Sequence, residues 1–231
     1  REASALILCG DIFNAWVGAD LAIEPPSWLA QAIHHFRQFS QDTPLFFMRG
    51  NRDFLLDARF AHYVGAQLLS DQIILKTDIH RIILPPGDEL CTDDLRYQRF
   101  RQRVRNKHLQ HWFLKLPLRW RLAIAGGLRQ RSHQQQQQLD WSISDINEQS
   151  AIELLEQHGQ WLLIHGHTHR PSFHRLHRNE DSDLTRIVLP DWEFDHSTPT
   201  RAGWIVLEQS GTVEMHRLHH PTLRLTLKPP H

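Results

Sequence analysis

The stretch Trp161-Leu162-Leu163-Ile164-His165-Gly166-His167-Thr168-His169-Arg170-Pro171 decides the fold that this sequence predicts. Its first four residues are apolar, which is typical of a buried strand, and alternating histidines follow where that strand ends. Side chains two residues apart in an extended segment point the same way, so we expect His167 and His169 to face one site. Imidazole is the commonest protein ligand of transition metals, which favours a metal site. Because the chain holds 18 histidines in 231 residues, a polar loop is the alternative interpretation.

Three further apolar segments end in a similar way. Each runs into a glycine beside an acidic or amide side chain: Ser4–Cys9 before Gly10-Asp11, Pro44–Met48 before Gly50-Asn51, and Arg81–Leu84 before Gly87-Asp88. Ligands of α/β sheets gather at the carboxyl ends of strands, where glycine permits tight turns and close backbone approach. The four strand ends together predict a mixed oxygen and nitrogen site, which suits Mn, Fe or Zn better than Ca.

Composition bounds the class of protein. A chain of 231 residues can bury a sizeable core, as one large domain or as a domain with an insertion. The 26 Lys and Arg residues balance 26 Asp and Glu residues, so the net charge indicates no particular partner. Cys9 and Cys91 lie far apart, which favours a reducing compartment without a disulfide framework. The chain opens at Arg1 and enters a strand almost at once, so we expect a truncated amino terminus rather than a signal peptide.

Helix signals lie between these strands. Ser27 can cap a helix whose apolar face consists of Trp28, Leu29, Ala32, Ile33, Phe36 and Phe39. The segment 57–63 predicts a short helix. Asp145-Ile146-Asn147-Glu148 resembles a capping box, and the helix that it opens is expected to stop at Gly159.

The carboxyl-terminal part has the pattern of antiparallel strands. These are expected at Arg186–Leu189, at Gly203–Leu207 and, after a turn at Ser210-Gly211, at Thr212–Leu218. The tail from His219 is rich in proline, and we expect it to fray.

The segment from Leu95 to Leu139 contains no acidic residue. Eleven of its residues are basic: Arg96, Arg99, Arg101, Arg103, Arg105, Lys107, Lys115, Arg119, Arg121, Arg129 and Arg131. Apolar residues interleave with them, which predicts an inserted pair of helices suited to an anionic lipid surface or an amphipathic anionic substrate. One alternative is an insertion that packs its apolar face on the core while its arginines face water. Nucleic acid is a third option, for which we find no recognition module.

Four ordered motifs match a known family along nearly the whole chain. Gly10–Gly18 reads GDIFNAWVG, Gly50–Leu55 reads GNRDFL, Gly87–Asp94 reads GDELCTDD, and His165–Pro171 reads HGHTHRP. This set resembles the calcineurin-like metallophosphoesterases and, within them, the UDP-2,3-diacylglucosamine hydrolases of lipid A biosynthesis. Arg52 strengthens the narrower resemblance, because most of the superfamily has histidine there.

The resemblance implies a fold and a metal centre. The fold is an α/β two-sheet sandwich flanked by helices, in one domain over 1–231 with a basic helical lid inserted at 95–140. The centre is a pair of Mn²⁺ ions. Asp11 would bridge the ions, Asn51 and His167 would hold one of them, and His169 would help to hold the other.

The resemblance also implies a reaction. The pyrophosphate of UDP-2,3-diacylglucosamine would be hydrolysed at the α-phosphate, giving UMP and 2,3-diacylglucosamine 1-phosphate. Catalysis would depend on Asp11, Asn51, Arg52 and His167, with Arg52 stabilising phosphate charge. Substrate contacts are implied for Asn51, Arg52, Asp94, Ser132, Gln136 and His167. The lid would shelter the acyl chains and hold a cytoplasmic protein on the inner face of the inner membrane, with neither nucleic acid nor a protein partner.

The sequence departs from the family pattern at three places. An Asp-x-His first motif does not occur before Gly10, Pro86 stands where the family has a ligand histidine, and Leu139 replaces a lysine. His80 lies in a different register from Pro86, and His165 either swings into the site or orients a ligand. The hypotheses left open are a working pyrophosphatase, a degenerate homologue that binds metal or nucleotide-lipid without turnover, and a phosphodiesterase with another substrate.

Simpler roles exist for several motif residues. Asp11 can cap a helix or form a turn, Asn51 can form an Asx-turn, and Arg52 can pair with Asp53. Asp93 and Asp94 can both cap the helix that follows, and we expect Asp93 to do so.

Overall fold

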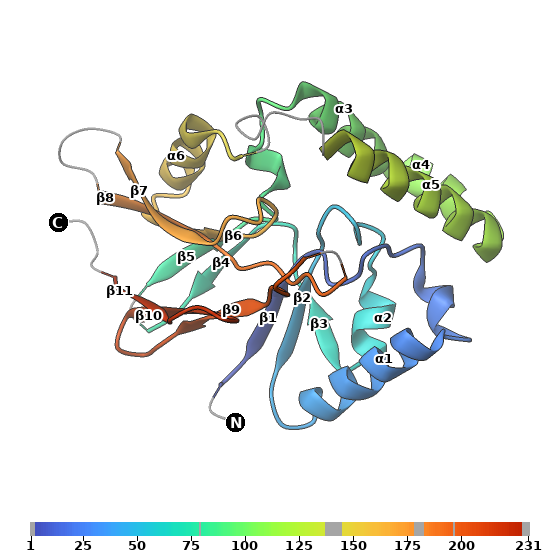
Figure 1. Ribbon diagram of the computed structural model, residues 1–231, viewed down its shortest axis with the longest axis horizontal. Coiled ribbons are helices and arrows are strands. Elements are labelled where there is room, and N and C mark those ends of the chain that lie inside the picture. The colour runs from blue at the N-terminus through green and yellow to red at the C-terminus, as the bar shows by residue number, and fades with distance from the viewer. Residues whose placement is uncertain (1–2, 79, 137–144, 178–182, 196, 228–231) are drawn as a thin grey trace. The chain divides into compact units, whose positions relative to one another are not determined.

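The computed structural model describes residues 3–78, 80–136, 145–177, 183–195 and 197–227, with the backbone alone at 130–136 and 183. The chain forms two compact units, one within residues 1–71 and 94–144 and the other within 72–93 and 145–231. Sheets and helices occur in both, which confirms the predicted α/β class (Figure 1). The single domain with a lid at 95–140 stays a prediction.

The first unit is built on a three-stranded parallel sheet. Its strands, in spatial order, are β1 (Leu6–Cys9), β2 (Leu45–Met48) and β3 (Ala66–Leu68). Helix α1 (Ser27–Ser40) connects the first two strands and α2 (Ala58–Tyr63) connects the next two; a 3₁₀ turn, η1 (Ala19–Ala22), precedes α1. Cys9 lies opposite Met48 in the register, so the loops that leave β1 and β2 begin side by side.

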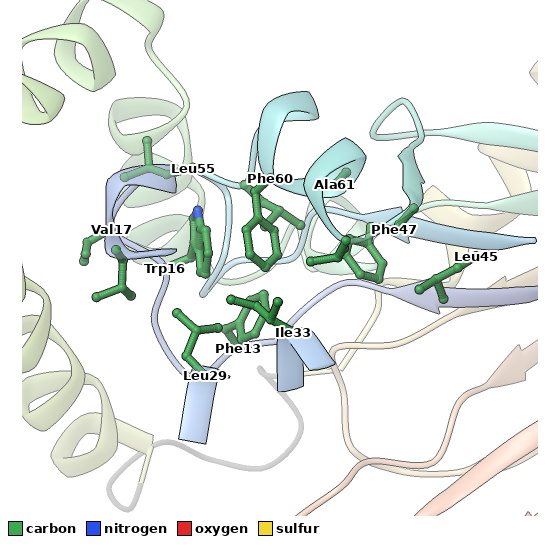
Figure 2. Close-up of a cluster of buried hydrophobic side chains, with 14 residues drawn as sticks. Phe13, Trp16, Val17, Leu29, Ile33, Leu45, Phe47, Leu55, Phe60 and Ala61 are labelled. Atoms are coloured by element: carbon green, nitrogen blue, oxygen red, sulfur yellow. The ribbon is translucent and has the colours of Figure 1, made fainter. Parts of the chain in front are cut away.

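An aromatic cluster fixes the loop after β1 (Figure 2). The ring centroids of Phe13 and Trp16 lie 4.8 Å apart, and those of Trp16 and Phe60 lie 4.3 Å apart. Leu29 and Ile33 of α1 complete this side of the core. Each such fully buried side chain stabilises the fold by about 1.5–3 kcal/mol. The residues just after Asp11 are therefore held in the core.

The two helices of this sheet begin differently. Asp57 caps α2, as its side chain accepts a hydrogen bond from Phe60 N at 3.0 Å, which confirms the short helix. The expected cap at Ser27 is wrong, because Ser27 is the first helical residue and Pro26, with φ −59° and ψ 157°, precedes the helix without a side-chain cap.

The basic segment forms three helices in place of the expected pair: α3 (Leu95–Val104), α4 (Lys107–Leu114) and α5 (Leu118–Gln136). The break after α3 is made by Asn106, whose side chain accepts from His108 N and Leu109 N. Pro117 immediately precedes α5, and its carbonyl oxygen accepts from Trp120 N at 2.9 Å and Arg121 N at 3.3 Å. Asp94 caps α3 by accepting from Tyr97 N at 2.8 Å, so the expected cap at Asp93 is wrong.

The second unit contains a five-stranded sheet and a three-stranded one. The larger has the order β4 (Ile73–Lys76), β5 (Arg81–Leu84), β6 (Leu162–His165), β8 (Asp183–Val188), β7 (Ser172–His177). β5, β6 and β8 are parallel, while the edge strands β4 and β7 are antiparallel to their neighbours. A 3₁₀ turn, η2 (Asp88–Leu90), follows β5, and α6 (Glu148–Gln157) precedes β6. Gly159 lies just beyond α6 with φ +59°, as predicted. The expected capping box from Asp145 to Glu148 is wrong, because Asn147 caps the helix by accepting from Ser150 N, and Glu148 is the first helical residue.

The smaller sheet is an antiparallel meander of β9 (Gly203–Leu207), β10 (Thr212–Arg217) and β11 (Leu223–Thr226). The first two strands confirm the prediction. The expectation of a frayed tail from His219 is wrong at 223–226, because the alternating residues Leu223 and Leu225 pair with β10. Among the described helices, none has the length and apolar character to cross a membrane.

Candidate active site

The loops after β1 and β2 meet in the first unit through glycines. A Cβ on Gly10 would lie 2.8 Å from Gly50 Cα, and Gly10 has φ +85°. A Cβ on Gly50 would overlap the backbone nitrogen and the carboxylate of Asp11. Only glycine permits this approach, which brings Asp11 and Asn51 together.

Asp53 ties the same loops to each other. Its carboxylate is fully buried and accepts from Gly50 N at 2.6 Å, Ile12 N at 2.7 Å and Asp11 N at 3.3 Å. Burial, and then the charge of Asp11, raise the pKa of Asp53 above its ordinary value. The suggested Arg52–Asp53 pair does not form; Arg52 Nη1 instead donates to Asn14 Oδ1 at 3.3 Å. The sequence did not predict that Asp53 accepts hydrogen bonds from these loops. Its position three residues after Gly50 was the only indication of this role.

Asp11 and Asn51, two of the predicted ligands, lie side by side. Asp11 Oδ1 accepts from Arg52 N at 2.8 Å. The terminal amide atom of Asn51 that faces Asp11 lies 2.5 Å from Oδ2 and 2.8 Å from Oδ1. An amide nitrogen in that place donates to the carboxylate, and an amide oxygen takes the same place when both groups share a cation. This donor set fits a divalent metal ion.

The second unit carries His165, His167 and His169. His165 is the last residue of β6 and is completely buried. Its Nδ1 lies 2.7 Å from Gly166 O, and its Nε2 has no hydrogen-bond partner among the described residues. Burial lowers the pKa of His165 to about 3, so its ring is neutral at physiological pH. A buried neutral ring at this place supports the loop rather than facing solvent.

The backbone at the predicted ligands differs from the extended segment that we expected. His167 has φ +73° and His169 has φ +56°, both in the left-handed region. Asp11 is there too, with φ +51°, and His219 is the fourth such non-glycine residue in the described chain. Residues other than glycine keep this strained conformation only when their surroundings impose it, and they cluster at functional sites.

His169 is oriented by a carboxylate. Its Nδ1 lies 3.0 Å from Asp191 Oδ2, and Arg201 donates to the same oxygen through Nη2 at 2.8 Å and Nε at 3.1 Å. Burial raises the pKa of Asp191, but the hydrogen bonds from His169 and Arg201 outweigh it, and the pKa falls to about 2. An ionised Asp191 favours the His169 tautomer with the proton on Nδ1, which leaves Nε2 available to a metal. Sequence analysis missed Asp191, although Ile187-Val188-Leu189-Pro190-Asp191 repeats the pattern of an apolar strand that ends in an acid.

Of the four predicted ligands, Asp11 and Asn51 lie in the first unit, and His167 and His169 lie in the second. Within the described part of the chain, no group of three or more His, Cys, Asp and Glu side chains is arranged to hold a metal ion.

Comparison with known proteins identifies the family. No protein-family model matches the chain. The chain is 43% identical over 210 residues to UDP-2,3-diacylglucosamine hydrolase of Bordetella pertussis, covering 91% of this chain and 81% of that protein. The chain belongs to the UDP-2,3-diacylglucosamine hydrolase family.

Other relatives of the same name agree. The enzyme of Chromobacterium violaceum is 43% identical, covering 90% of this chain and 83% of that protein, and the enzyme of Haemophilus influenzae is 40% identical, covering 85% and 80%. Among solved structures, a mutant of Vps29 from Entamoeba histolytica aligns with a TM-score of 0.38 at 13% identity, over 84% of this chain and 89% of that one.

Pro86 is a position at which this member of the UDP-2,3-diacylglucosamine hydrolase family differs from the ligand pattern that the resemblance implies. Pro85, Pro86 and Gly87 are buried after β5. A Cβ on Gly87 would lie 2.9 Å from Gly166 O and 3.3 Å from His167 Cβ, so this loop lies against the histidine loop. Gly87, the residue after Pro86, thus lies close to His167. The side chain of Pro86 has no donor atom. His80 precedes β5 and lies at the opposite end of that strand, so it does not substitute.

The remaining substrate positions that the UDP-2,3-diacylglucosamine hydrolase resemblance implies lie in and around the basic helices. Asp94 is half-buried and caps α3. Ser132 and Gln136 lie on α5, where the structure describes the backbone alone, and Leu139 lies outside the described residues.

Proposed function

We propose that this protein hydrolyses the pyrophosphate bond of UDP-2,3-diacylglucosamine, giving UMP and 2,3-diacylglucosamine 1-phosphate in lipid A biosynthesis. The observation that carries the proposal is the 43% identity over 91% of the chain to a UDP-2,3-diacylglucosamine hydrolase. The strained backbone of Asp11, His167 and His169 supports it, because these are the residues that the motifs assign to the metal.

In this proposal Asp11, Asn51, His167 and His169 hold a pair of Mn²⁺ ions. Bound divalent ions supply a nucleophile from water near neutral pH and neutralise phosphate charge. Hydrogen bonds within the chain orient two of the proposed metal ligands. Arg52 N fixes one carboxylate oxygen of Asp11 at 2.8 Å, and Asp191 fixes the Nδ1 side of His169 at 3.0 Å. These bonds set the direction of each donor before a metal binds.

Arg52 would stabilise the phosphates. Its guanidinium is half-buried and bonds only weakly to Asn14 Oδ1, at 3.3 Å. A planar guanidinium can exchange such a bond for two parallel bonds to phosphate oxygens. Charge that develops on the leaving phosphate in the transition state is then met by a fixed donor.

The basic helices would receive the acyl chains and the membrane surface. Their exposed apolar side chains are Leu95, Phe100, Leu109, Trp112, Leu114, Leu116, Trp120, Leu122, Ile124 and Leu128. Trp112 and Trp120 are 69% and 57% exposed, among exposed arginines. Tryptophan beside basic residues is typical of surfaces that lie at the level of anionic lipid headgroups. This supports a peripheral place on the cytoplasmic face of the inner membrane.

One observation favours a second candidate function. The buried Pro86 stands where the resemblance implies a ligand histidine, and its side chain has no donor atom. A homologue with an incomplete ligand set would bind a metal or the nucleotide-lipid without turnover.

The test is release of UMP from UDP-2,3-diacylglucosamine with Mn²⁺. It compares this chain with Pro86→His, each preceded by a strand that carries an Asp-x-His motif. Release by both supports a hydrolase that tolerates Pro86. Release by Pro86→His alone supports the second candidate, and release by neither contradicts the proposed activity.

A further inference from the structure

A pocket beside His169 lies wholly within the second unit. His169 and Asp191 form one wall, the loop 199–202 forms another, and Arg217, Leu218 and His220 close it with Pro171 and Pro190. It encloses about 100 Å³. One water molecule takes about 30 Å³ in the liquid, so the pocket has room for a group the size of phosphate.

Arg217 is the cation of this pocket that lacks an anion. Its Nε is shielded from solvent and has no hydrogen-bond partner among the described residues. The residue as a whole is half-buried. A shielded N–H without a partner is costly, because it has lost its water and gained nothing in return. An anion in the pocket would remove that cost.

The Asp191 carboxylate, which lines the pocket, does not pair with Arg217. Asp191 is already engaged by His169 and by two nitrogens of Arg201. Two guanidinium groups therefore line the pocket against one carboxylate, and His220 adds an exposed imidazole that can donate a hydrogen bond to an anion. The balance of charge attracts an anion rather than a cation.

The walls are held by backbone bonds. Leu218 N donates to Ala202 O at 2.8 Å, which joins the end of β10 to the start of β9. His220 N donates to Arg217 O at 3.1 Å across a turn in which His219 has φ +63°. The turn between Arg217 and His220 therefore contains a non-glycine residue with left-handed backbone. Among the described residues, the others with this backbone are three predicted ligands, Asp11, His167 and His169.

We propose that this pocket binds the phosphate group of a phosphate monoester, with Arg217 as its principal donor and His220 as its second. A tetrahedral dianion accepts several bonds at once from a guanidinium and an imidazole, and these charge-assisted bonds are the strong ones. The identity of the ester rests on the proposed function, whose two products are both phosphate monoesters. Because the pocket touches His169, it is placed to receive a phosphate that leaves the metal site.

Calorimetric titration of the full chain in EDTA tests the pocket without metal. The probes are UMP, glucosamine 1-phosphate and inorganic phosphate, with uridine as the ligand that lacks phosphate. We expect the phosphates to bind and uridine not to bind. A preference for UMP or for glucosamine 1-phosphate over inorganic phosphate identifies which product the pocket takes.

Variants make the test specific to the pocket. Arg217→Gln is expected to weaken phosphate binding by about tenfold or more, since it removes a charged donor. Arg217→Lys, which retains the charge, is expected to bind more tightly than Arg217→Gln. Arg175→Gln is the control, because Arg175 is an exposed arginine of β7 outside the pocket. If Arg217→Gln does not fold, as judged by circular dichroism, His220→Gln on the exposed turn replaces it, with about a threefold or larger loss expected.

Absence of phosphate binding in EDTA overturns the proposal, as does equal binding by the variant and the Arg175→Gln control. The proposed hydrolase fails by a different readout, which is Mn²⁺-dependent UMP release. If the chain binds phosphate without metal and releases no UMP, the pocket proposal stands and the proposed hydrolase activity is contradicted.

Discussion

Arg121 of α5 and Asp20 of η1 form a two-bond ion pair in which the arginine is buried and the aspartate half-exposed. Arg121 Nη1 lies 2.9 Å from Asp20 Oδ1, Nη2 bonds to Oδ2, and Nη1 also donates to Val17 O at 2.5 Å. Arg121 Nε donates to Leu116 O at 2.9 Å. The arginine thus joins a basic helix to the loop that starts at Asp11. A Cβ on Gly18, which has φ +136°, would overlap Nη1, so the pair also needs glycine there.

We predict that Arg121→Met loosens the basic helices. The change removes the donors to Asp20, Val17 and Leu116, and we expect the free energy of unfolding to fall by about 1–3 kcal/mol. Trypsin cleavage within 95–136 should become faster in the native protein. The control is Arg119→Met, on the exposed arginine two residues earlier. Equal cleavage rates in the two variants would show that the pair does not anchor α5.

We predict that Asp191→Asn weakens metal binding. The amide no longer favours the His169 tautomer with the proton on Nδ1, and loss of such a partner costs about 10–100-fold in metal affinity. Equilibrium dialysis with Mn²⁺ measures the affinity, and the nitrogen chemical shifts of His169 report the tautomer without any activity assay. Asp195→Asn, on an exposed aspartate, should change neither. An unchanged tautomer in Asp191→Asn would contradict the role given to this carboxylate.

We predict that Asp53→Asn destabilises the first unit more than Asp57→Asn does. Asp53 accepts three backbone N–H bonds in a fully buried place, and an amide nitrogen there would face at least one of these donors. A buried donor left unsatisfied costs about 1–3 kcal/mol. Asp57 accepts one bond at the start of α2, where an asparagine also caps well. Urea denaturation of both variants measures the difference, and equal midpoints would contradict it.

We predict that His80 makes the fold less stable in mild acid. It is buried, both ring nitrogens lack hydrogen-bond partners among the described residues, and burial lowers its pKa below the ordinary value of 6.5. The unfolded chain therefore binds a proton first as the pH falls below 6.5, and stability decreases down to the folded-state pKa, by at most about 1.4 kcal/mol per pH unit. In His80→Leu this part of the decrease should vanish between pH 7 and pH 5.

Urea midpoints across that pH range measure the effect. His34→Gln, at an exposed histidine of α1, provides the comparison and should keep the pH dependence of the unaltered chain. Parallel curves for His80→Leu and the unaltered chain would rule out His80 as the source.

The sequence by itself determined the strands whose apolar residues are contiguous and whose ends carry a glycine. β1, β2, β5 and β6 were predicted in this way, and so were the motifs that place the chain in its family, because each of these signals is local. Local sequence signals were insufficient where two neighbouring residues could each cap a helix, and where a strand depends on a pairing partner. Proline rather than Ser27 precedes α1, Asp94 rather than Asp93 caps α3, and Leu223 to Thr226 form a strand because β10 offers them a partner.

Only the tertiary structure decided which side chains support the site. Asp53 is adjacent to Arg52 in the sequence, which allows the two side chains to pair, yet its carboxylate binds backbone groups from a loop some forty residues away. Asp191 reaches His169 across 22 residues, and Arg121 reaches Asp20 across 101. The left-handed backbone at His167 and His169 replaced the extended segment that alternation suggested. Periodicity records which residues are buried, whereas a hydrogen bond between distant residues depends on how the strands and helices pack, and that is decided by the whole core at once.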